Sequence, residues 1–264
     1  GIARMTPRAQ IEQRFAVYLN AVSPTRAASV YARRAARHLL AGRDVERVLI
    51  GAAQADEPVS EVQQRTLALV LAAGMSRRMG RPKVLLPWGA QTVLEQIVCQ
   101  LRGHVHEIVI VTGAQREAVE AIAARVGAGC VHNSDYTSGE MLTSLQVGLR
   151  ELIARDAVAA LTVLGDQPMI RAANVRKIVR AYAQGQGGIV APSHTMRRGH
   201  PILIDRRYWQ ELLDLPPGSA PRDVINHHGD DIAYVETDDS VLRDIDTPEA
   251  YQEELRRAGI VSRD

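Results

Sequence analysis

From residue 66 onward, short apolar runs alternate with amphipathic stretches, and this alternation constrains the fold more than any other feature. The apolar runs predict strands at 66–72, 107–112, 129–132, 158–164, 188–192, 201–204 and 232–236. Apolar residues spaced three and four apart predict helices at 91–103, 115–126, 141–154, 171–183, 206–213 and 247–258. Strands that alternate with helices favour the α/β class, with a mostly parallel sheet covered by helices on both faces.

The preceding residues follow a different pattern. Apolar residues recur at helical spacing in three runs between residues 6 and 55, and the polar stretch 54–65 has the composition of a linker. We therefore expect a short helical N-terminal extension over residues 1–64 and one α/β domain over residues 65–264.

No segment has the length that a membrane helix requires. The longest apolar run, Leu67–Met75, has nine residues, under half of the ~20 needed to span a bilayer. The first residues lack the apolar stretch of a secretory signal, and Cys99 and Cys130 fit buried thiols in a reducing compartment. We expect a cytoplasmic protein without a membrane partner.

The charge distribution argues against nucleic acid as the main partner. The net charge is +2, but the first 65 residues alone carry ten arginines against six acidic side chains. The remaining residues therefore carry a net charge of −2 (2 minus 4), without the basic excess that nucleic acid binding favours.

The strongest chemical signal is the stretch Leu71–Lys83, directly after the first predicted strand. A loop at the carboxyl end of a strand borders the ligand crevice of an α/β sheet. Small residues at 72–74 let backbone N–H groups close around anionic oxygens, and Arg77, Arg78 and Lys83 add positive charge. This combination predicts a polyphosphate cradle; the alternative is an ordinary strand-to-loop transition.

The glycine spacing in this stretch excludes two familiar nucleotide-binding loops. The distance between Gly74 and Gly80, and the absence of Ser or Thr after Lys83, exclude a Walker loop. The Gly-x-Gly-x-x-Gly pattern is also absent, which argues against a nicotinamide-dependent oxidoreductase.

Written as Leu-Ala-Ala-Gly-x-Ser-x-Arg-Met-Gly-x-x-Lys, residues 71–83 resemble the signature of nucleotidyltransferases that activate molybdopterin-type cofactors, above all the molybdenum cofactor cytidylyltransferases. The resemblance implies a Rossmann-like α/β domain over residues 66–264, with the triphosphate held by Arg78 and Lys83. Residues 72–74 are Ala-Ala-Gly, which resembles the branch of the family that uses CTP. The guanylyltransferase branch tends to have Ala-Gly-Gly at the same three positions.

Two acidic segments supply candidate ligands for Mg²⁺. Asp166 follows the predicted strand 158–164 closely, which sets one carboxylate at the sheet edge. An Mg²⁺ ion that bridges triphosphate oxygens needs only one or two protein carboxylates. Gly-Asp-Gln-Pro at 165–168 and Asp-Ile-Asp-Thr-Pro at 244–248 resemble the family's boxes, which makes Asp166 and Asp246 the expected metal ligands. Alternatively, Asp166 forms a turn and Asp246 only favours the start of the following helix.

The segment 133–145 resembles the family's nucleotide-contacting segment, although Gly139 and Glu140 stand in exchanged order. A helix start without a ligand is the alternative. The resemblance implies catalytic residues Arg78, Lys83 and Asp166. The nucleotide- and acceptor-binding residues that we expect are Leu71, Ala72, Ala73, Gly74, Ser76, Arg78, Lys83, Gly113, Asn133, Ser144 and His200.

The acceptor side is expected at Gly199-His200-Pro201, which resembles the family's Gly-His-Pro box. Arg197, Arg198 and His200 could meet a pterin phosphate or dithiolene; the alternative is a basic hairpin turn in solvent. Within the first 65 residues, Ala21–Ala27 and Leu39–Arg43 loosely resemble the helical tail of flavin-binding subunits of xanthine dehydrogenase-type enzymes. The extension would then be a remnant of such a tail, or a plain helical addition.

The resemblance implies transfer of CMP from CTP to the phosphate of a molybdopterin-type molybdenum cofactor, with Mg²⁺ and release of pyrophosphate. The product would serve a xanthine dehydrogenase-type apoenzyme. Two alternatives stay open: transfer of guanylyl or another nucleotide to a related phosphate acceptor, and non-catalytic delivery of the cofactor.

Overall fold

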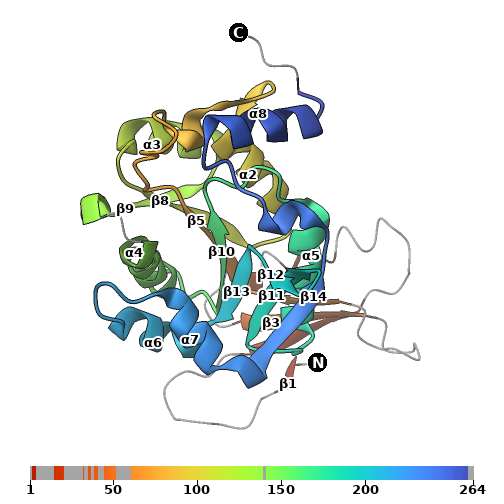
Figure 1. Ribbon diagram of the computed structural model, residues 1–264. Coiled ribbons are helices and arrows are strands. Elements are labelled where there is room, and N and C mark those ends of the chain that lie inside the picture. The colour runs from red at the N-terminus through yellow and green to blue at the C-terminus, as the bar shows by residue number, and fades with distance from the viewer. Residues whose placement is uncertain are drawn as a thin grey trace. The chain divides into compact units, whose positions relative to one another are not determined.

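The computed structural model (Figure 1) describes residues 2–3, 15–20, 32, 35–36, 39–40, 45–51, 61–138 and 141–260. The chain divides into two compact units, Gly1–Arg65 and Thr66–Asp264. Because strand β4 (Glu61–Gln64) ends at Gln64 and β5 (Thr66–Leu71) begins at Thr66, the division falls between two strands.

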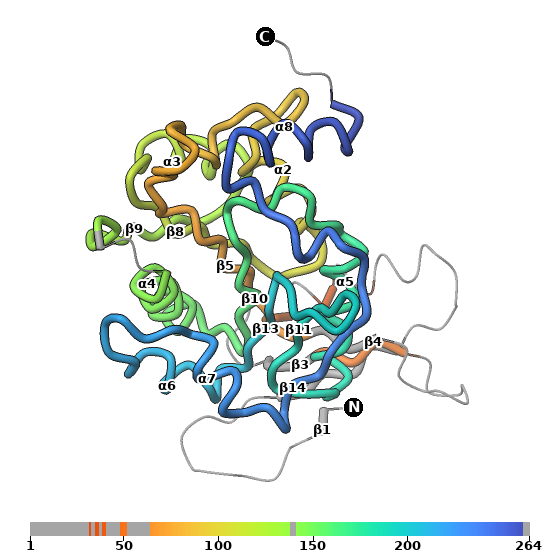
Figure 2. The backbone as a smooth tube through the Cα atoms, viewed as in Figure 1, coloured from red at the N-terminus to blue at the C-terminus, as the bar shows by residue number. Residues whose placement is uncertain are grey.

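The second unit is built on an eight-stranded sheet with the strand order β12-β11-β13-β10-β5-β8-β9, in which β14 also pairs with β11. Strands β8, β5 and β10 run parallel side by side at its centre (Figure 2), whereas β13 is antiparallel to both of its neighbours. The strands besides β5 are β8 (Glu107–Thr112), β9 (Gly129–His132), β10 (Ala159–Leu164), β11 (Ile189–His194), β12 (Arg197–Arg198), β13 (Ile202–Asp205) and β14 (Ile232–Glu236).

Side chains of β5 alternate between two apolar layers, as the pleat of a strand requires. Ala68 and Val70 pack with α2, α3, α5 and α8 on one face, while Leu67 and Leu69 pack with α4, α6 and α7 on the other. The α/β class with helices on both faces is therefore confirmed. The helices are α2 (Val93–Leu101), α3 (Arg116–Val126), α4 (Met141–Ala154), α5 (Ala172–Ala183), α6 (Trp209–Asp214), α7 (Pro221–His227) and α8 (Pro248–Arg257).

The direction of β13 follows from a tight hairpin, which was the alternative to an acceptor site at Arg197 and Arg198; its two-residue turn was not predicted. His194 pairs with Arg197, so only Thr195 and Met196 form the turn, and their φ angles of 48° and 65° are left-handed. Two-residue hairpin turns require such angles because their twist then matches that of the strands. Helix α7 and the hairpin of β6 (Pro87–Trp88) with β7 (Gln91–Thr92) were also not predicted. Among the described residues, every helix is too short or too polar to cross a membrane.

The prediction of an all-helical N-terminal extension is wrong where the structure describes it. Strands β1 (Ile2–Ala3), β2 (Phe15–Asn20), β3 (Val45–Gly51) and β4 form a four-stranded sheet, in which β2 and β3 are parallel. Helical residues are described only at 32, 35–36 and 39–40, and Ala36 and Leu40 share a small buried cluster with Val48 and Ile50. Short apolar runs suit a strand and a helix equally well, so periodicity alone misassigned them.

The prediction of a linker over residues 54–65 is also wrong in part, because β4 lies within this range and pairs with β3. The other residues of the first unit on which helices, a linker or a flavin-subunit tail were expected lie outside the described part of the chain.

We expect the second unit to fold independently, because its apolar layers lie within residues 66–264. A chain shortened to begin at Arg65 should unfold in one cooperative transition, within about 5 °C of the matching transition of the full chain. Circular dichroism during thermal unfolding measures this. An insoluble product, or one without a cooperative transition, would show that residues 1–64 are integral to the domain.

Candidate active site

The candidate site lies where β5 and β10 end next to each other. Leu71 pairs with Leu164 in register, and Gly165 N–H donates to the Leu71 carbonyl at 3.0 Å. A Cβ atom on Gly165 would lie 2.6 Å from that carbonyl oxygen, so the close approach requires glycine. The pairing brings Asp166 beside the loop that follows β5.

Small residues let this loop pass close to the end of β8. Ala72 N–H donates to the Val111 carbonyl at 3.0 Å, and the Ala73 carbonyl accepts from Ala114 N–H at 3.3 Å. Gly113 is required here, since its Cβ would lie 2.4 Å from the Ala73 oxygen. Gly113 therefore shapes the loop and is not among the residues that line the cleft described below.

Ser76 closes the loop on itself. Its φ of 51° is left-handed, which is strained for a residue other than glycine. Its Oγ accepts from Lys83 N–H at 3.1 Å, and its carbonyl accepts from the N–H groups of Met79 and Gly80. These contacts fix the path from Ser76 to Lys83, where the 3₁₀ turn η1 (Lys83–Leu85) begins.

A cleft of about 510 Å³ opens between these strand ends. Most of the expected site residues line it: Leu71, Ala72, Ala73, Gly74, Ser76, Arg78, Lys83, Ser144, Asp166 and Asp246. The sequence did not single out five further lining residues: Met75, Val84, Tyr136, Met141 and Leu164. Of these, Tyr136 and Met141 belong to the segment 133–145, which resembles the family's nucleotide-contacting segment as a whole but does not mark these two residues individually.

One connected group of charged side chains in the cleft consists of Lys83, Asp166, Asp246 and Arg78. The Lys83 ammonium lies 3.1 Å from Asp166 Oδ2 and also donates to Asp246 Oδ1. Arg78 Nη1 lies 2.8 Å from the other oxygen of Asp246. Because Lys83 and Asp246 are 163 positions apart, only the fold brings them together.

The pKa values follow from these contacts. Burial by itself lowers the pKa of Lys83, but the hydrogen bond to Asp246 and the charge of Asp166 outweigh burial, and the pKa is raised. The hydrogen bond from Lys83 lowers the pKa of Asp246, which partial burial opposes and the charge of Arg78 supports. Lys83 and Asp246 are therefore both charged at neutral pH.

The two carboxylates fit a divalent cation that completes its shell from elsewhere. Asp166 Oδ1 is buried and has no hydrogen-bond partner among the described residues, which leaves an oxygen ligand available. No cluster of three or more His, Cys, Asp or Glu residues that could hold a metal occurs in the described part of the chain. Mg²⁺ commonly takes one or two carboxylates and fills its remaining positions with phosphate oxygens and water.

Asn133 holds the start of α4 in place. It is 1% exposed, and its Nδ2 donates to Ser144 Oγ at 3.0 Å and to Thr143 Oγ1 at 3.2 Å, while its Oδ1 accepts from Asp135 N–H. Ser144 lines the cleft, whereas Asn133 is absent from its lining. The exchanged pair Gly139 and Glu140 lies outside the described residues.

His200 is buried near enough to Asp166 to be affected by its charge, but it is absent from the cleft lining. Burial lowers the pKa of His200 to about 4, against the smaller opposing effect of the Asp166 charge, so the ring is neutral at pH 7. Its backbone N–H donates to the Val241 carbonyl at 2.9 Å, and its peptide bond to Pro201 is cis.

Comparison with known proteins agrees with this geometry. Residues 68–232 match the family model described as the MobA-like NTP transferase domain. The chain is 28% identical to the molybdenum cofactor cytidylyltransferase of Escherichia coli over 187 residues, 69% of this chain and 92% of the relative. It is 36% identical to the nicotine blue oxidoreductase of Paenarthrobacter nicotinovorans over 144 residues, 52% of this chain and 69% of the relative.

A solved structure shows the same fold. The manganese complex of Rv0371c from Mycobacterium tuberculosis H37Rv superimposes with a TM-score of 0.57 and is 27% identical, covering 73% of this chain and 99% of that one. The two proteins therefore share the α/β domain that forms the cleft.

Proposed function

We propose, from the premise that this chain belongs to the family of MobA-like NTP transferase domains, that it transfers CMP from CTP to the terminal phosphate of a molybdopterin-type cofactor and releases pyrophosphate. The coarser assignment, a nucleotidyltransferase of the molybdenum cofactor family, follows from the family match together with the E. coli relative. The choice of CTP and the identity of the acceptor are the proposal.

The observation that carries the proposal is the cluster of Lys83, Asp166, Asp246 and Arg78 at the strand ends. In nucleotidyl transfer a phosphate oxygen attacks the α-phosphorus in line, the bond to the β-phosphate oxygen breaks, and pyrophosphate leaves. Such a reaction needs no protein nucleophile, so catalysis consists of positioning and of stabilising charge on oxygens.

Each group in the cleft has a role in that chemistry. The backbone N–H groups after Leu71, together with Arg78 and Lys83, would bind the triphosphate and stabilise the negative charge that builds up on the departing pyrophosphate. Asp166 and Asp246 would hold a divalent cation, for which we propose Mg²⁺, and a bound cation would neutralise charge on phosphate oxygens. Manganese in the related Rv0371c structure supports a divalent metal.

Lys83 and a metal ion would share the same two carboxylates. The Lys83 ammonium contacts both Asp166 and Asp246. A metal ion that binds both carboxylates would therefore compete with this ammonium. A triphosphate supplies other anionic oxygens for the ammonium, and we therefore propose that nucleotide and metal bind more tightly together than separately.

The proposed choice of CTP rests on the Ala72-Ala73 pair and on the cytidylyltransferase relative. A second candidate, an oxidoreductase reaction, is favoured only by the name of the nicotine blue oxidoreductase. The cations at the cleft and the two carboxylates support phosphate chemistry instead.

Thermal unfolding with different nucleotides tests this proposal. CTP with Mg²⁺ at about 100 times its Kd should stabilise the native state by about 2.7 kcal/mol, which raises Tm by roughly 5–10 °C. GTP at the same concentration should raise Tm by less. An equal or larger shift with GTP would contradict the choice of CTP but not nucleotidyl transfer, whereas a shift with NADPH alone would favour the oxidoreductase.

Two expectations extend this proposal beyond the site. We propose that the protein acts in the cytoplasm and that its product is inserted into an apoenzyme of the xanthine dehydrogenase type. The second rests on the sequence resemblance given above, and the first is supported by the free thiols of Cys99 and Cys130, which suit a reducing compartment.

A further inference from the structure

Asp246 lies on an irregular segment between β14 and α8 and not on a strand of the sheet. After β14 the chain forms the 3₁₀ turn η5 (Asp239–Leu242) and then passes through Asp244 to Thr247, where α8 begins. Ile245 N–H donates to the Asp166 carbonyl at 3.0 Å, and the Ile245 side chain is fully buried. A carboxylate on such a segment needs further contacts to keep its position beside Asp166.

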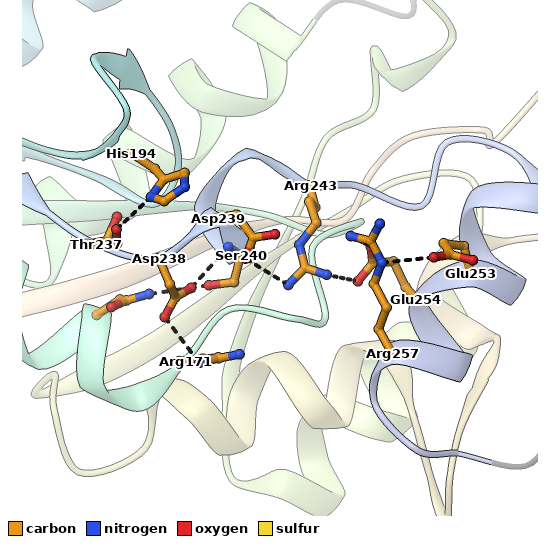
Figure 3. A network of polar contacts seen from close by, with 11 residues as sticks. Arg171, His194, Thr237, Asp238, Asp239, Ser240, Arg243, Glu253, Glu254 and Arg257 are labelled. Atoms are coloured by element: carbon orange, nitrogen blue, oxygen red, sulfur yellow. Dashed lines mark hydrogen bonds and ion pairs between the residues drawn. The ribbon is translucent and has the colours of Figure 1, made fainter.

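An ion pair fastens this segment to α8 (Figure 3). Arg243 Nη1 donates to Glu254 Oε2 at 2.6 Å, and Arg243 Nη2 lies 3.5 Å from Asp239 Oδ1. The Glu254 side chain is only 7% exposed, and its other oxygen lies 3.4 Å from Arg257 Nη1. Glu254 is therefore a buried carboxylate whose charge is balanced by arginine.

The same helix holds the segment at its other end. Thr247 is the N-cap of α8, and its Oγ1 accepts from Ala250 N–H at 3.2 Å. Arg243 and Thr247 thus attach both ends of a short span to α8, and Asp246 lies within that span. Asp246 lies three positions after Arg243 and directly before Thr247, so both attachments are close enough to restrict where its carboxylate lies.

Upstream of this span, a second set of contacts joins η5 to α5 (Figure 3). Asp238 accepts from Ser240 N–H at 3.0 Å and lies 3.3 Å from Arg171, while Asn174 Nδ2 donates to Ser240 Oγ at 3.3 Å. The contacts of Arg243 with Asp239 and Glu254 extend this network to α8. The segment from Asp238 to Thr247 is therefore attached to α5 before Asp246 and to α8 on both sides of Asp246.

A buried ion pair is a poor source of net stability, because desolvation of the two charges offsets most of their attraction. Its directional hydrogen bonds nevertheless fix one relative placement of the groups that carry it. We propose that Arg243 and Glu254 are positioning residues that hold Asp246 at the metal site beside Asp166. This inference rests on the proposed function, because it assumes that Asp166 and Asp246 bind a divalent cation.

The test is Mn²⁺ binding by Glu254→Gln, measured by electron paramagnetic resonance in the presence of a non-hydrolysable CTP analogue. The substitution preserves side-chain size and one acceptor oxygen but removes the charge that orients Arg243. We expect the Kd for Mn²⁺ to rise about tenfold, the lower end of the effect of losing an outer-shell partner. Binding of the analogue without metal should stay within about twofold of the parent, since Arg78, Lys83 and the loop are unchanged.

Glu253→Gln is the matched control. It removes the same charge from the neighbouring position, but Glu253 is exposed and pairs with Arg256 and Arg257 instead of Arg243. Its Kd for Mn²⁺ should stay within about twofold of the parent, as expected for a surface ion pair.

Glu254→Gln alone leaves the Arg243 charge without Glu254 and could for that reason fail to fold. The double variant Arg243→Gln/Glu254→Gln removes both charges of the pair and so provides a second test. It should raise the Kd for Mn²⁺ as much as Glu254→Gln does, since both variants break the same attachment. A folded variant with a lowered Tm but with Mn²⁺ binding within about twofold of the parent would overturn the inference. A parent protein that binds the analogue but no Mn²⁺ would overturn the metal site itself, and a parent that binds neither would overturn the proposed function.

Discussion

Replacing Asp166 with Asn should lower turnover with saturating CTP, Mg²⁺ and molybdopterin cofactor by about 10²–10³, the expected cost of losing one preorganised electrostatic contact. The substitution preserves side-chain size, so the β10 end and its hydrogen bond from Gly165 to Leu71 should persist. It removes the buried oxygen that has no partner among the described residues, and puts an amide where a cation would bind. Steady-state kcat, with the fold checked by circular dichroism, is the measurement.

The control for this prediction is Asp230→Asn. Asp230 is an exposed carboxylate in η4 (Gly229–Asp231), just before β14 begins and so at the opposite end of that strand from the cleft. Its substitution makes the same charge change without touching the site. Turnover of Asp166→Asn within about threefold of the parent, a barrier change below 1 kcal/mol, would mean that Asp166 is not a metal ligand.

Replacing Lys83 with Ala separates the phosphate site from the metal site. The variant should lose about 10²–10³ in kcat, because in the proposed mechanism the ammonium stabilises charge that grows on the departing pyrophosphate. Mn²⁺ binding in the absence of nucleotide should become tighter, since the ammonium that contacts Asp166 and Asp246 is gone. Turnover kinetics and Mn²⁺ titration measure the two effects separately.

The chain supplies a matched control in Lys177, its only other lysine. Lys177 is exposed and donates to the Glu236 carbonyl, so Lys177→Ala removes a lysine charge without changing the cleft. If Lys83→Ala weakened Mn²⁺ binding instead of strengthening it, the ammonium would support the metal site, and the proposed competition would be wrong.

The centre of the parallel sheet could be predicted because β5, β8 and β10 are continuous apolar runs that are mostly buried. Strands 107–112, 129–132 and 232–236 have the predicted bounds. The six predicted helices differ from those of the structure only at their ends or by a 3₁₀ turn, whereas α7 was missed. The N-terminal unit could not be predicted in the same way. Strands β2 and β3 are short apolar runs, β4 is polar, and only the pairing of these strands with each other decides against a helix and a linker.

The candidate site shows the same division between local and tertiary information. The loop after β5 is recognisable because small residues and cations occur together within a few positions. The contact of Lys83 with Asp246 and the burial of His200 both depend on segments distant in sequence. No local pattern contains that information, because the partners are chosen by the packing of the sheet.

Pyrophosphate release tests the central claim most directly. The full chain would be incubated with Mg²⁺ and with CTP or GTP, each with and without molybdopterin cofactor, and pyrophosphate and the cofactor product would be quantified. Transfer of CMP predicts one pyrophosphate per cytidylated cofactor, formed only when CTP and the acceptor are both present. Faster release with GTP, or no acceptor-dependent release with either nucleotide, would contradict it.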